Sequence, residues 1–378
     1  MKKKILFLCN HASFFISHRL NIYLEAKKRK YDFLLVTGKS SSIEMEKKAL
    51  KVIKKKKIPH KILNFNSYKL NLFNDFSSIL KLKNIISKYE PDIFHTVAPK
   101  TNLYGGIVSN FSKIKLTIIS FSGMGFLFSG NLSFVNLVKK FFYTKILSFI
   151  FLNKKLKVIV QNKDDYLFLK EKYNLRDRVK LITGGSGIDL NKFNKLKIKK
   201  NKNIVFSARL VKNKGITEFI NAAILLKKIY PDWNFLIYGA KDYLSHDEFN
   251  LNNFKELIKN KIIFYKGYKE NVASILQNSC IFCLPSYREG MPKSVLEASA
   301  AGIPSVVTNT VGCKEAIINN KTGLLVKLKD YKDLSLKIEM LIKNKNLRNS
   351  FSKNAKKFAR INSSLKLVTK KIFNLYEN

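Results

Sequence analysis

The chain has 378 residues, which is more than one hydrophobic core usually organises and suits two domains of similar size. Hydrophobic residues make up 46% of it and aromatic residues 12%, which indicates a well-packed globular protein. Its 71 basic and 26 acidic residues give a formal net charge of +45; part of this excess reflects a general richness in Lys, Ile and Asn, and the rest favours anionic partners. No zinc-finger or RNA-recognition pattern accompanies the charge, so we expect no nucleic-acid partner.

The sequence predicts neither a signal peptide nor a membrane-spanning helix. The first apolar run, residues 5–9, is too short for a signal peptide, and no stretch reaches the ~18 apolar residues of a spanning helix. Four cysteines are few, and Cys280 and Cys283 fall around a predicted strand without a second pair or a nearby histidine. We interpret the cysteines as structural thiols of a protein in a reducing, cytoplasmic compartment.

Strands and helices alternate along the first half of the chain. Short apolar runs predict strands, and apolar residues at helical spacing predict the helices between them. The expected strands are 4–9, 33–36, 61–65, 93–96, 116–120, 157–160 and 179–182, and the expected helices are 19–28, 42–55, 76–88, 101–110 and 163–172. This alternation predicts a parallel, Rossmann-like α/β sheet. No G-x-G-x-x-G follows the first strand, so the fingerprint of a dinucleotide site is absent.

Polar residues gather where the strands of this first sheet are expected to end. Ligands of parallel sheets bind beyond the carboxyl ends of the strands. Three of the five histidines lie at such positions, which leaves two interpretations open: a polar cleft for an acceptor, or three structural side chains. The residues concerned are Asn10, His11, His18, Arg19, His95, Thr96, Lys100 and 120–125.

The segment 134–157 combines apolar residues at helical spacing with lysines. It suits a core helix whose lysines extend to solvent, and equally an interfacial helix that faces anionic lipid. The preceding loop, 120–130, holds glycines that allow close approach of a ligand, and several phenylalanines that would be unfavourable if left uncovered.

A glycine-rich turn at 183–189 and a Lys/Asn-rich stretch after it mark the best linker in the chain. We predict a first domain at 1–190, a linker at 191–202, a second domain at 203–360, and a final helix at 361–378 that returns to the first domain. The α/β pattern restarts in the second half, with strands at 204–208, 234–238, 262–265, 281–284, 305–308 and 324–326, and helices at 216–229, 271–278 and 292–300, before two C-terminal helical segments.

The loop between the strand 281–284 and the helix 292–300 has the features of an anion site. Pro292 suits a first helical position, and Gly302 and Pro304 end the helix. Free N–H groups from Gly290 to Ser294 would then face an anion such as a diphosphate. Glu289 and Glu297 are isolated acids beside it, which we expect to hold hydroxyls of a sugar and a ribose.

Two cations follow the strand 204–208. Arg209 and Lys214 lie in one loop, which can aim both at a single point. A nucleotide-sugar donor leaves as a nucleoside diphosphate, so its developing negative charge needs neutralising. The chain contains no Asp-x-Asp pair to hold a metal. Two cations and a helix N-terminus would replace the metal, so we expect no metal cofactor.

Glu289 and Glu297 stand in an E-x7-E arrangement within EGMPKSVLEA, followed by AGIPSVVT, and ARLVKNKG covers 208–215. These segments resemble the retaining glycosyltransferases of family 4, which implies the GT-B fold, two Rossmann-like domains that face each other across a cleft. The resemblance implies that Arg209 and Lys214 bind the donor diphosphate, that Glu289 contacts the donor sugar as the main catalytic carboxylate, and that Glu297 binds the ribose. The implied donor site also includes Gly239, Tyr268 at the nucleobase edge, Gly290, Met291, Pro292 and Ser294.

The first half is similar to bacterial enzymes of the N-acetylgalactosaminyltransferase type that extend undecaprenyl-diphosphate-linked saccharides. The segments that carry this likeness are FHTVAPKTNLYG (94–105), FSGMGFLFSG (121–130) and the loop that ends at His18-Arg19. Many members have a His after the fifth strand, where this chain has Ser122, so His95 and His18 become the candidates for contact with the reacting sugar.

The resemblance therefore implies a retaining transfer from a UDP-sugar to a polyprenyl-diphosphate-linked saccharide, by a protein peripheral on the cytoplasmic face of an anionic inner membrane. A family member with a soluble acceptor is the alternative, and a basic nucleic-acid-binding protein is a second one.

Overall fold

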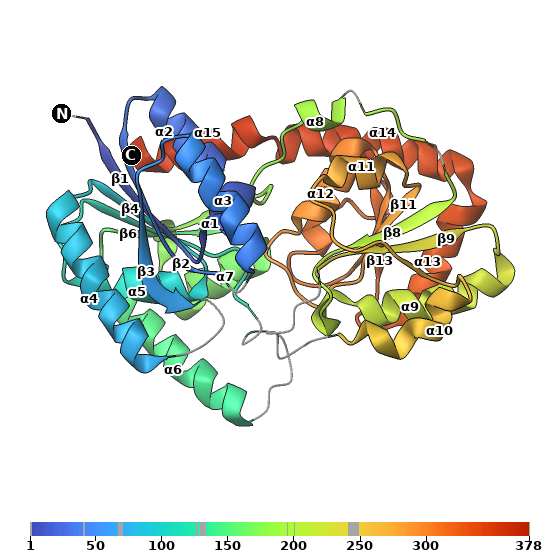
Figure 1. Ribbon diagram of the computed structural model, residues 1–378, viewed down its shortest axis with the longest axis horizontal. Coiled ribbons are helices and arrows are strands. Elements are labelled where there is room, and N and C mark those ends of the chain that lie inside the picture. The colour runs from blue at the N-terminus through green and yellow to red at the C-terminus, as the bar shows by residue number, and fades with distance from the viewer. Residues whose placement is uncertain are drawn as a thin grey trace. The chain divides into compact units, whose positions relative to one another are not determined.

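The computed structural model describes the chain except residues 1, 41, 67–70, 126–127, 129–133, 195, 200, 241–248 and 378. It divides into two compact units, each built on a parallel sheet with helices on both faces (Figure 1). Unit 1 comprises Met1–Ile182 and Thr369–Asn378, and unit 2 comprises Thr183–Val368. The prediction of two Rossmann-like α/β domains, each with a parallel sheet, is therefore confirmed.

Unit 1 holds a seven-stranded sheet in the order β3-β2-β1-β4-β5-β6-β7. All its neighbouring strands pair in parallel. The strands are β1 (Lys4–Cys9), β2 (Asp32–Lys39), β3 (His60–Asn66), β4 (Ile93–Val97), β5 (Leu116–Ser120), β6 (Leu156–Val160) and β7 (Val179–Leu181). The helices are α1 (Ala12–His18), α2 (Leu20–Lys28), α3 (Ile43–Lys55), α4 (Leu72–Tyr89), α5 (Pro99–Asn110), α6 (Phe134–Ile150) and α7 (Lys163–Lys172), with a 3₁₀ turn at Arg176–Arg178.

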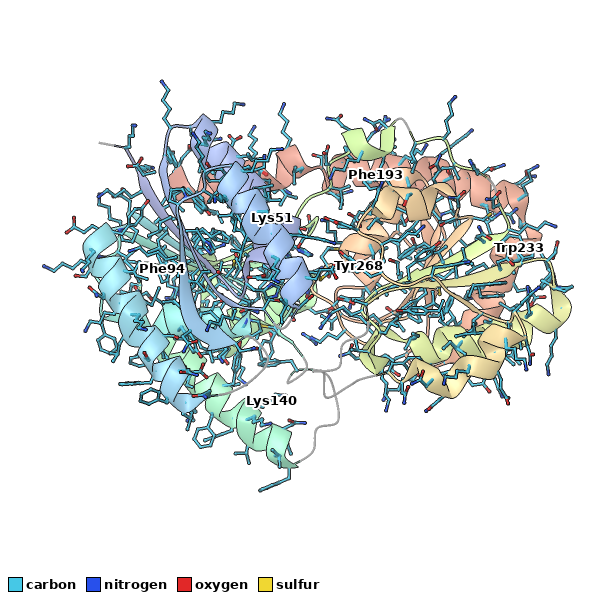
Figure 2. The ribbon with its side chains drawn as sticks, in the orientation of Figure 1. Lys51, Phe94, Lys140, Phe193, Trp233 and Tyr268 are labelled. Carbon is cyan, nitrogen blue, oxygen red and sulfur yellow. The ribbon has the colours of Figure 1, made fainter. Side chains whose placement is uncertain are left out.

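The central strands of unit 1 are covered on both faces. Five of the six residues of β1 and all five of β4 are buried, as expected for parallel strands between two helix layers. Phe94 of β4 lies inside this core (Figure 2). The sequence order of the strands reverses between β1 and β4, so the carboxyl ends of these two strands flank a topological switch point, where ligands of such sheets bind.

Unit 2 holds a six-stranded parallel sheet in the order β10-β9-β8-β11-β12-β13. The strands are β8 (Asn203–Ser207), β9 (Asn234–Tyr238), β10 (Phe264–Tyr265), β11 (Ile281–Leu284), β12 (Ser305–Thr308) and β13 (Gly323–Val326). The helices are α8 (Asn191–Asn194), α9 (Ile216–Ile229), α10 (Lys255–Lys259), α11 (Val272–Gln277), α12 (Lys293–Ala301), α13 (Tyr331–Lys343), α14 (Lys345–Asn362) and α15 (Leu365–Glu377), with 3₁₀ turns at Lys212–Lys214, Leu251–Phe254 and Lys314–Ala316. Here the switch point lies between β8 and β11.

The C-terminal helix α15 contributes to both units. Its first residues belong to unit 2, and Thr369–Asn378 belong to unit 1. Within unit 1, Asn21 Nδ2 donates to Thr369 Oγ1 at 2.6 Å, and Tyr376 is 3% exposed. The domain limits expected from sequence, at 1–190, 203–360 and 361–378, stay predictions. The expected linker, 191–202, contains the short helix α8.

Several local predictions differ from the structure. Helix α4 begins at Leu72, four residues before its predicted start, and β10 is limited to Phe264–Tyr265. Pro292 is the N-cap residue of α12, and the helix begins one residue later, at Lys293. The segment 10–17, expected as a loop, contains α1. The described part of the loop 120–130 follows β5 as expected, and Phe126 lies outside the described residues.

Helix α6 has two different faces. Tyr143, Leu147 and Ile150 are buried in the core beside β5 and β6, while Phe134, Phe141 and Phe142 are exposed. The buried face fits the interpretation as a core helix, and the interpretation as a membrane-facing helix stays a prediction. Across the described part of the chain, none of the helices combines the length and apolar character needed to cross a bilayer.

Candidate active site

Two loops meet at the carboxyl end of the sheet in unit 2, at its switch point. The loop after β8 carries Lys214, and the loop after β11 carries Glu289. Lys214 Nζ forms an ion pair with Glu289 Oε1, and the two side chains are only 18% and 14% exposed. Ser286 Oγ donates to the same carboxylate oxygen at 2.8 Å. A cation and an anion predicted on separate loops thus lie in contact.

Glycines allow these loops to approach one another. A Cβ on Gly215, which has φ of +75°, would lie 2.0 Å from the carbonyl oxygen of Pro285. A Cβ on Gly312, which has φ of +76°, would lie 2.2 Å from the carbonyl oxygen of Glu289. Both positions need glycine for the backbone conformation and for space. Gly215 ends a motif and Gly312 lies in a predicted turn, but their close contacts are not predicted from sequence, because the neighbouring atoms come from other loops.

Ser286 fixes the start of the β11–α12 loop. Its side chain is fully buried, and besides Glu289 it donates to the carbonyl oxygen of Asn213 at 3.1 Å. Its own carbonyl oxygen accepts from the hydroxyls of Thr308 and Thr310 and from the thiol of Cys313. This arrangement holds the loop of Glu289 against the loop of Lys214. Sequence reasoning missed Ser286, which carries no motif of its own.

The N-terminus of α12 lies next to Glu289 in the chain. No side chain caps this helix, and its first turn has no acidic residue. Met291 and Pro292 are buried there, and Ser294 is half-buried. An uncapped helix N-terminus presents N–H groups and a partial positive charge, so it suits an anion such as a phosphate.

Glu297 lies one helical turn into α12. Its side chain is 13% exposed, with Lys293 Nζ 3.8 Å from Oε1. Burial raises the pKa of Glu297 above its ordinary value, and the positive charges of Lys293 and Lys192 act against that rise. A carboxylate accepts several hydrogen bonds, so the hydroxyls of a ligand can bind Glu297 beside Lys293.

The remaining predicted donor-site residues surround the same sheet edge. Arg209 is exposed in the loop after β8, and Gly239 follows β9, where a Cβ would lie 1.9 Å from the carbonyl oxygen of Ala208. Tyr268 follows β10 and is 52% exposed (Figure 2). Gly290 is buried between Glu289 and Met291. The roles predicted for these residues stay predictions.

In unit 1, His95 is engaged on both ring nitrogens. Nδ1 lies 2.5 Å from the hydroxyl of Tyr376, and Nε2 lies 2.6 Å from Oγ of Ser120. The side chain is 1% exposed, and burial, with the nearby charge of Arg19, lowers its pKa well below the ordinary value. A neutral ring bonded on both sides positions its neighbours and has no free nitrogen for a ligand.

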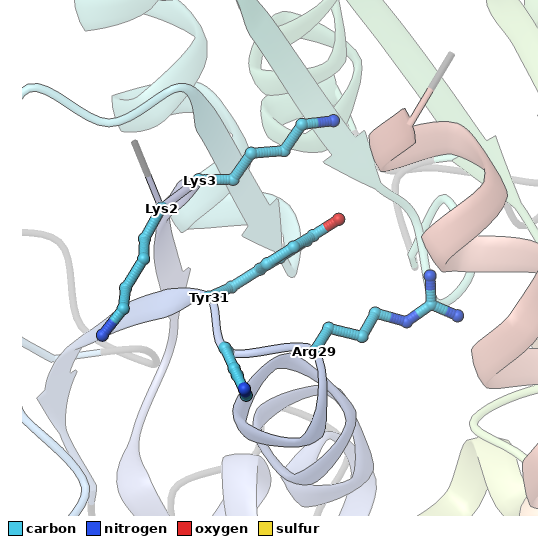
Figure 3. A pocket seen from close by; sticks show the side chains of 5 residues that line it. Lys2, Lys3, Arg29 and Tyr31 are labelled. Carbon is cyan, nitrogen blue, oxygen red and sulfur yellow. The ribbon is translucent and has the colours of Figure 1, made fainter.

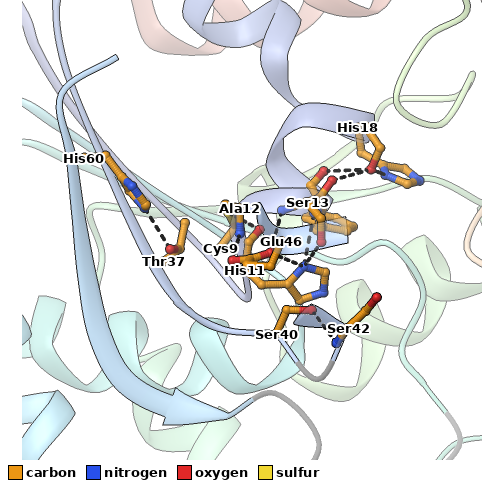
Figure 4. Close-up of polar contacts among 12 residues, drawn as sticks. Cys9, His11, Ala12, Ser13, His18, Thr37, Ser40, Ser42, Glu46 and His60 are labelled. Atoms are coloured by element: carbon orange, nitrogen blue, oxygen red, sulfur yellow. Dashed lines mark hydrogen bonds and ion pairs between the residues drawn. The ribbon is translucent and has the colours of Figure 1, made fainter. Parts of the chain in front are cut away.

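His18 and His11 lie around α1 (Figure 4). The ring of His18 stacks on Phe14, with ring centroids 4.9 Å apart, and its Nδ1 lies 2.6 Å from Ser17 Oγ. His11 caps α1, and Glu46 of α3 accepts from the backbone N–H groups of Ala12 and Ser13 at 2.9 and 3.0 Å. The N-terminus of α1 is therefore already occupied by a carboxylate of the protein itself.

A cavity of about 460 Å³ in unit 1 is lined by Lys2, Lys3, Arg29, Lys30 and Tyr31 (Figure 3). These residues precede β1 and β2, so the cavity lies at the amino ends of the strands, opposite the switch point. We assign it no part in the active site. Among the described residues, no group of three or more His, Cys, Asp or Glu side chains is arranged to hold a metal ion.

The chain was compared with known families and proteins. Residues 187–358 match the family described as glycosyl transferases group 1, and residues 4–162 match the family described as glycosyl transferase 4-like. The N,N'-diacetylbacillosaminyl-diphospho-undecaprenol α-1,3-N-acetylgalactosaminyltransferase of Campylobacter jejuni is 30% identical over 92% of this chain and 91% of its own. The UDP-Gal:α-D-GlcNAc-diphosphoundecaprenol α-1,3-galactosyltransferase of Escherichia coli is 29% identical over 69% of each chain.

Solved structures show the same fold. A glycosyltransferase from Rickettsia africae superposes with a TM-score of 0.77 at 22% identity, over 100% of this chain and 98% of that one. Anabaena HepE, solved with UDP and glucose, gives a TM-score of 0.77 at 16% identity over 99% of both chains. With family matches to both units and a relative that spans nearly the whole chain, this protein belongs to the family 4, group 1 glycosyltransferases, and is a glycosyltransferase with the GT-B fold.

Proposed function

We propose that this enzyme transfers a hexose or N-acetylhexosamine from a UDP-sugar to a polyprenyl-diphosphate-linked saccharide, with retention of the anomeric configuration. The observation that carries the proposal is the contact of Lys214 with Glu289 beside the uncapped N-terminus of α12. The printed names of the C. jejuni and E. coli relatives, both of which act on undecaprenyl-diphosphate-linked saccharides, support this choice of acceptor.

The donor occupies unit 2 in this proposal. Negative charge develops on the departing diphosphate, and Arg209, Lys214 and the N-terminus of α12 neutralise it without a metal. Glu297 accepts from the ribose hydroxyls, and Glu289 contacts the sugar while it orients Lys214. Gly239, Tyr268, Gly290, Met291, Pro292 and Ser294 complete the donor site, with Tyr268 at the edge of the base.

Retention follows if the acceptor hydroxyl attacks on the face that the diphosphate leaves. The departing phosphate then takes the proton of the acceptor, so the protein need not supply a strong base. His95 supports this assignment, because both nitrogens of its buried ring are hydrogen-bonded and neither is free to act as a base.

An exposed apolar surface on unit 1 suits the lipid end of such an acceptor. We define the α4–α6 surface as Leu72, Phe73, Phe76, Phe134, Val135, Leu137, Phe141 and Phe142, each at least half exposed. Helices α4 and α6 both pack against α5, and α6 contains lysines but no acidic residue. Large aromatic side chains with interspersed lysines are typical of helices that insert into the headgroup region of anionic bilayers. We therefore propose that unit 1 docks on the cytoplasmic face of the membrane.

A UDP-release assay tests the chemistry. Purified enzyme is incubated with a panel of UDP-sugars, with and without polyprenyl-diphosphate sugars, and the anomeric configuration of the product is read by NMR. Release that depends on the lipid-linked acceptor supports the proposal. Equal turnover with a short water-soluble glycoside would favour the alternative of a soluble acceptor, and an inverted product would refute retention.

Vesicle sedimentation tests the membrane surface. The wild-type enzyme should sediment with vesicles that contain anionic lipid, and Phe73→Ser combined with Phe142→Ser should weaken this binding at least tenfold, since each exposed Phe contributes roughly 1.5–3 kcal/mol when buried. Ile229→Ser, at a similarly exposed apolar residue of α9 in unit 2, is the matched control. Unchanged binding by the double variant would contradict the proposed surface.

A further inference from the structure

Arg19 is a buried cation, and among the described residues it has no carboxylate as an ion-pair partner. Arg19 lies between α1 and α2, and the residue is only 5% exposed. Nη1 donates to the carbonyl oxygen of His18 and Nη2 to Oγ of Ser122, both at 3.1 Å. Within the part of the chain that the structure describes, no carboxylate comes within ion-pair distance of this guanidinium.

The groups around Arg19 are neutral at physiological pH. Burial raises the pKa of the Cys9 thiol and of the Tyr376 hydroxyl, so neither carries a negative charge, and His95 is neutral because its pKa is lowered. The carboxylate of Glu46 accepts hydrogen bonds from the backbone N–H groups of Ala12 and Ser13 at the N-terminus of α1. Burial lowers the pKa of Arg19 to about 10, which still leaves it charged at pH 7.

Such a cation is unfavourable in the unliganded protein. Taking a charge out of water costs several kcal/mol per ion even after relaxation, and a purely structural arginine in this position would normally have a carboxylate beside it. Two neutral oxygens satisfy part of its hydrogen-bonding capacity, and the ring of Phe14, whose centroid lies 5.8 Å from Cζ, offsets part of its charge, but no anion neutralises it among the described residues. The free energy is recovered when an anion binds.

The position of Arg19 fits a ligand site. Cys9 ends β1, and Ser122 follows β5, so the guanidinium lies at the carboxyl end of the sheet, near the switch point between β1 and β4. Ser122 itself is exposed, which gives solvent access to the groups beside Nη2. Gly123 follows with φ of +114°, a backbone conformation that favours glycine.

We propose that Arg19 binds a phosphate group of the diphosphate-linked acceptor. This inference rests on the proposed function, because the acceptor is the one phosphorylated substrate expected in unit 1. A guanidinium donates two parallel N–H groups to phosphate oxygens, and a charge-assisted hydrogen bond contributes more than a neutral one. Ser122 then exchanges its bond to Arg19 for a bond to the ligand or to water.

Kinetics with two matched acceptors test the proposal. One acceptor carries the sugar on a short polyprenyl diphosphate, and the other carries the same sugar on a neutral alkyl chain. With donor saturating, Arg19→Gln should raise KM for the diphosphate acceptor roughly 10- to 100-fold. It should leave kcat/KM for the neutral acceptor within a factor of about three, and Arg19→Lys should recover part of the loss. An equal loss with both acceptors, or no loss with either, would overturn the proposal.

Two further measurements separate this site from a structural role and from the proposed function as a whole. Arg178, whose guanidinium donates to the carbonyl oxygens of Phe151 and Asn153 at 2.9 Å, is the matched structural control. Arg178→Gln should lower the unfolding temperature and change both acceptors alike, whereas Arg19→Gln should leave the unfolding temperature unchanged or raise it. A clear fall for Arg19→Gln would mean that the cation serves the fold.

Direct binding does not depend on turnover. In the presence of saturating UDP, which fills the donor site, inorganic pyrophosphate should bind the wild-type enzyme and bind Arg19→Gln at least tenfold more weakly. If the wild type shows this binding but transfers no sugar to any polyprenyl diphosphate, the proposed acceptor is wrong and the anion site stands. If pyrophosphate binds both proteins equally, the anion site is wrong whatever the acceptor is.

Discussion

Replacing Lys214 with Met separates a catalytic role of the Lys214–Glu289 pair from a structural one. The variant keeps most of the side-chain volume and removes the positive charge of Lys214, which we propose neutralises the departing diphosphate. Loss of one charge-stabilising contact in a transition state costs about 2–4 kcal/mol, which lowers the rate of transfer roughly 30- to 1000-fold.

The same substitution affects stability by a different amount. Lys214 and Glu289 are 18% and 14% exposed, so Glu289 would be left as a largely buried anion with Ser286 as its hydrogen-bond donor. Removing one partner of a fully buried pair costs about 3–5 kcal/mol, and the remaining solvent access reduces this to about 1–3 kcal/mol here. Adding Glu289→Gln to Lys214→Met should restore most of the free energy of unfolding.

The assay measures UDP release and urea unfolding for the two single variants and the double variant. Lys212→Met is the matched control, because Lys212 is exposed in the same 3₁₀ turn and should change neither quantity. We expect the double variant to be nearly as stable as the wild type and as inactive as Lys214→Met. Recovery of activity together with stability would refute the catalytic assignment, and so would a Lys214→Met variant that turns over at the wild-type rate.

Two other substitutions probe the same unit. Gly312→Ala places a Cβ 2.2 Å from the carbonyl oxygen of Glu289 at φ of +76°, and should lower the free energy of unfolding by more than about 2 kcal/mol. Gly267→Ala is the control: at φ of +68° with no atom within 4 Å, it should lower that free energy by only about 1 kcal/mol. Urea unfolding measures both. Equal losses would mean that the close approach of the loops is unimportant. Burial raises the pKa of Glu297, so the native state binds this proton more tightly than the unfolded chain, and stability decreases as pH rises from the ordinary value of 4.5 through the raised pKa. Glu297→Gln should remove that decrease, unfold at a higher urea concentration at pH 7, and weaken UDP binding roughly tenfold by calorimetry; an unchanged UDP affinity would contradict a ribose contact.

The strands and the candidate donor site were accessible from sequence where the signal was local. The strand at 281–284 is fully apolar between turn residues, and it matches β11 at both ends. Glu289 and Lys214 were each identified from their own loops. The sequence predicted that both residues line one cleft, but not that they form an ion pair. The ion pair depends on the close approach of loops at Gly215 and Gly312, whose neighbours are distant in sequence.

Tertiary contacts account for what the sequence did not predict. Helix α1 was taken for a loop because Glu46, from α3, supplies the acceptor for its first N–H groups. His95 looked like a candidate for the reacting centre because nothing local shows that Tyr376 takes its Nδ1. Arg19 was noted as a polar residue at a strand end and as the last residue of a loop that carries the family resemblance, but its burial cannot be read from a sequence pattern.

The return of α15 to unit 1 has a consequence for synthesis on the ribosome. Tyr376 closes the core around His95, so the nascent amino-terminal unit remains incomplete until the whole of Thr183–Val368 has been translated. At bacterial and eukaryotic elongation speeds of about 5–20 residues per second, that interval is roughly 10–40 s. Throughout this interval the core of unit 1 lacks the residues of α15 that cover His95, so the apolar surface beneath them stays accessible to chaperones and proteases.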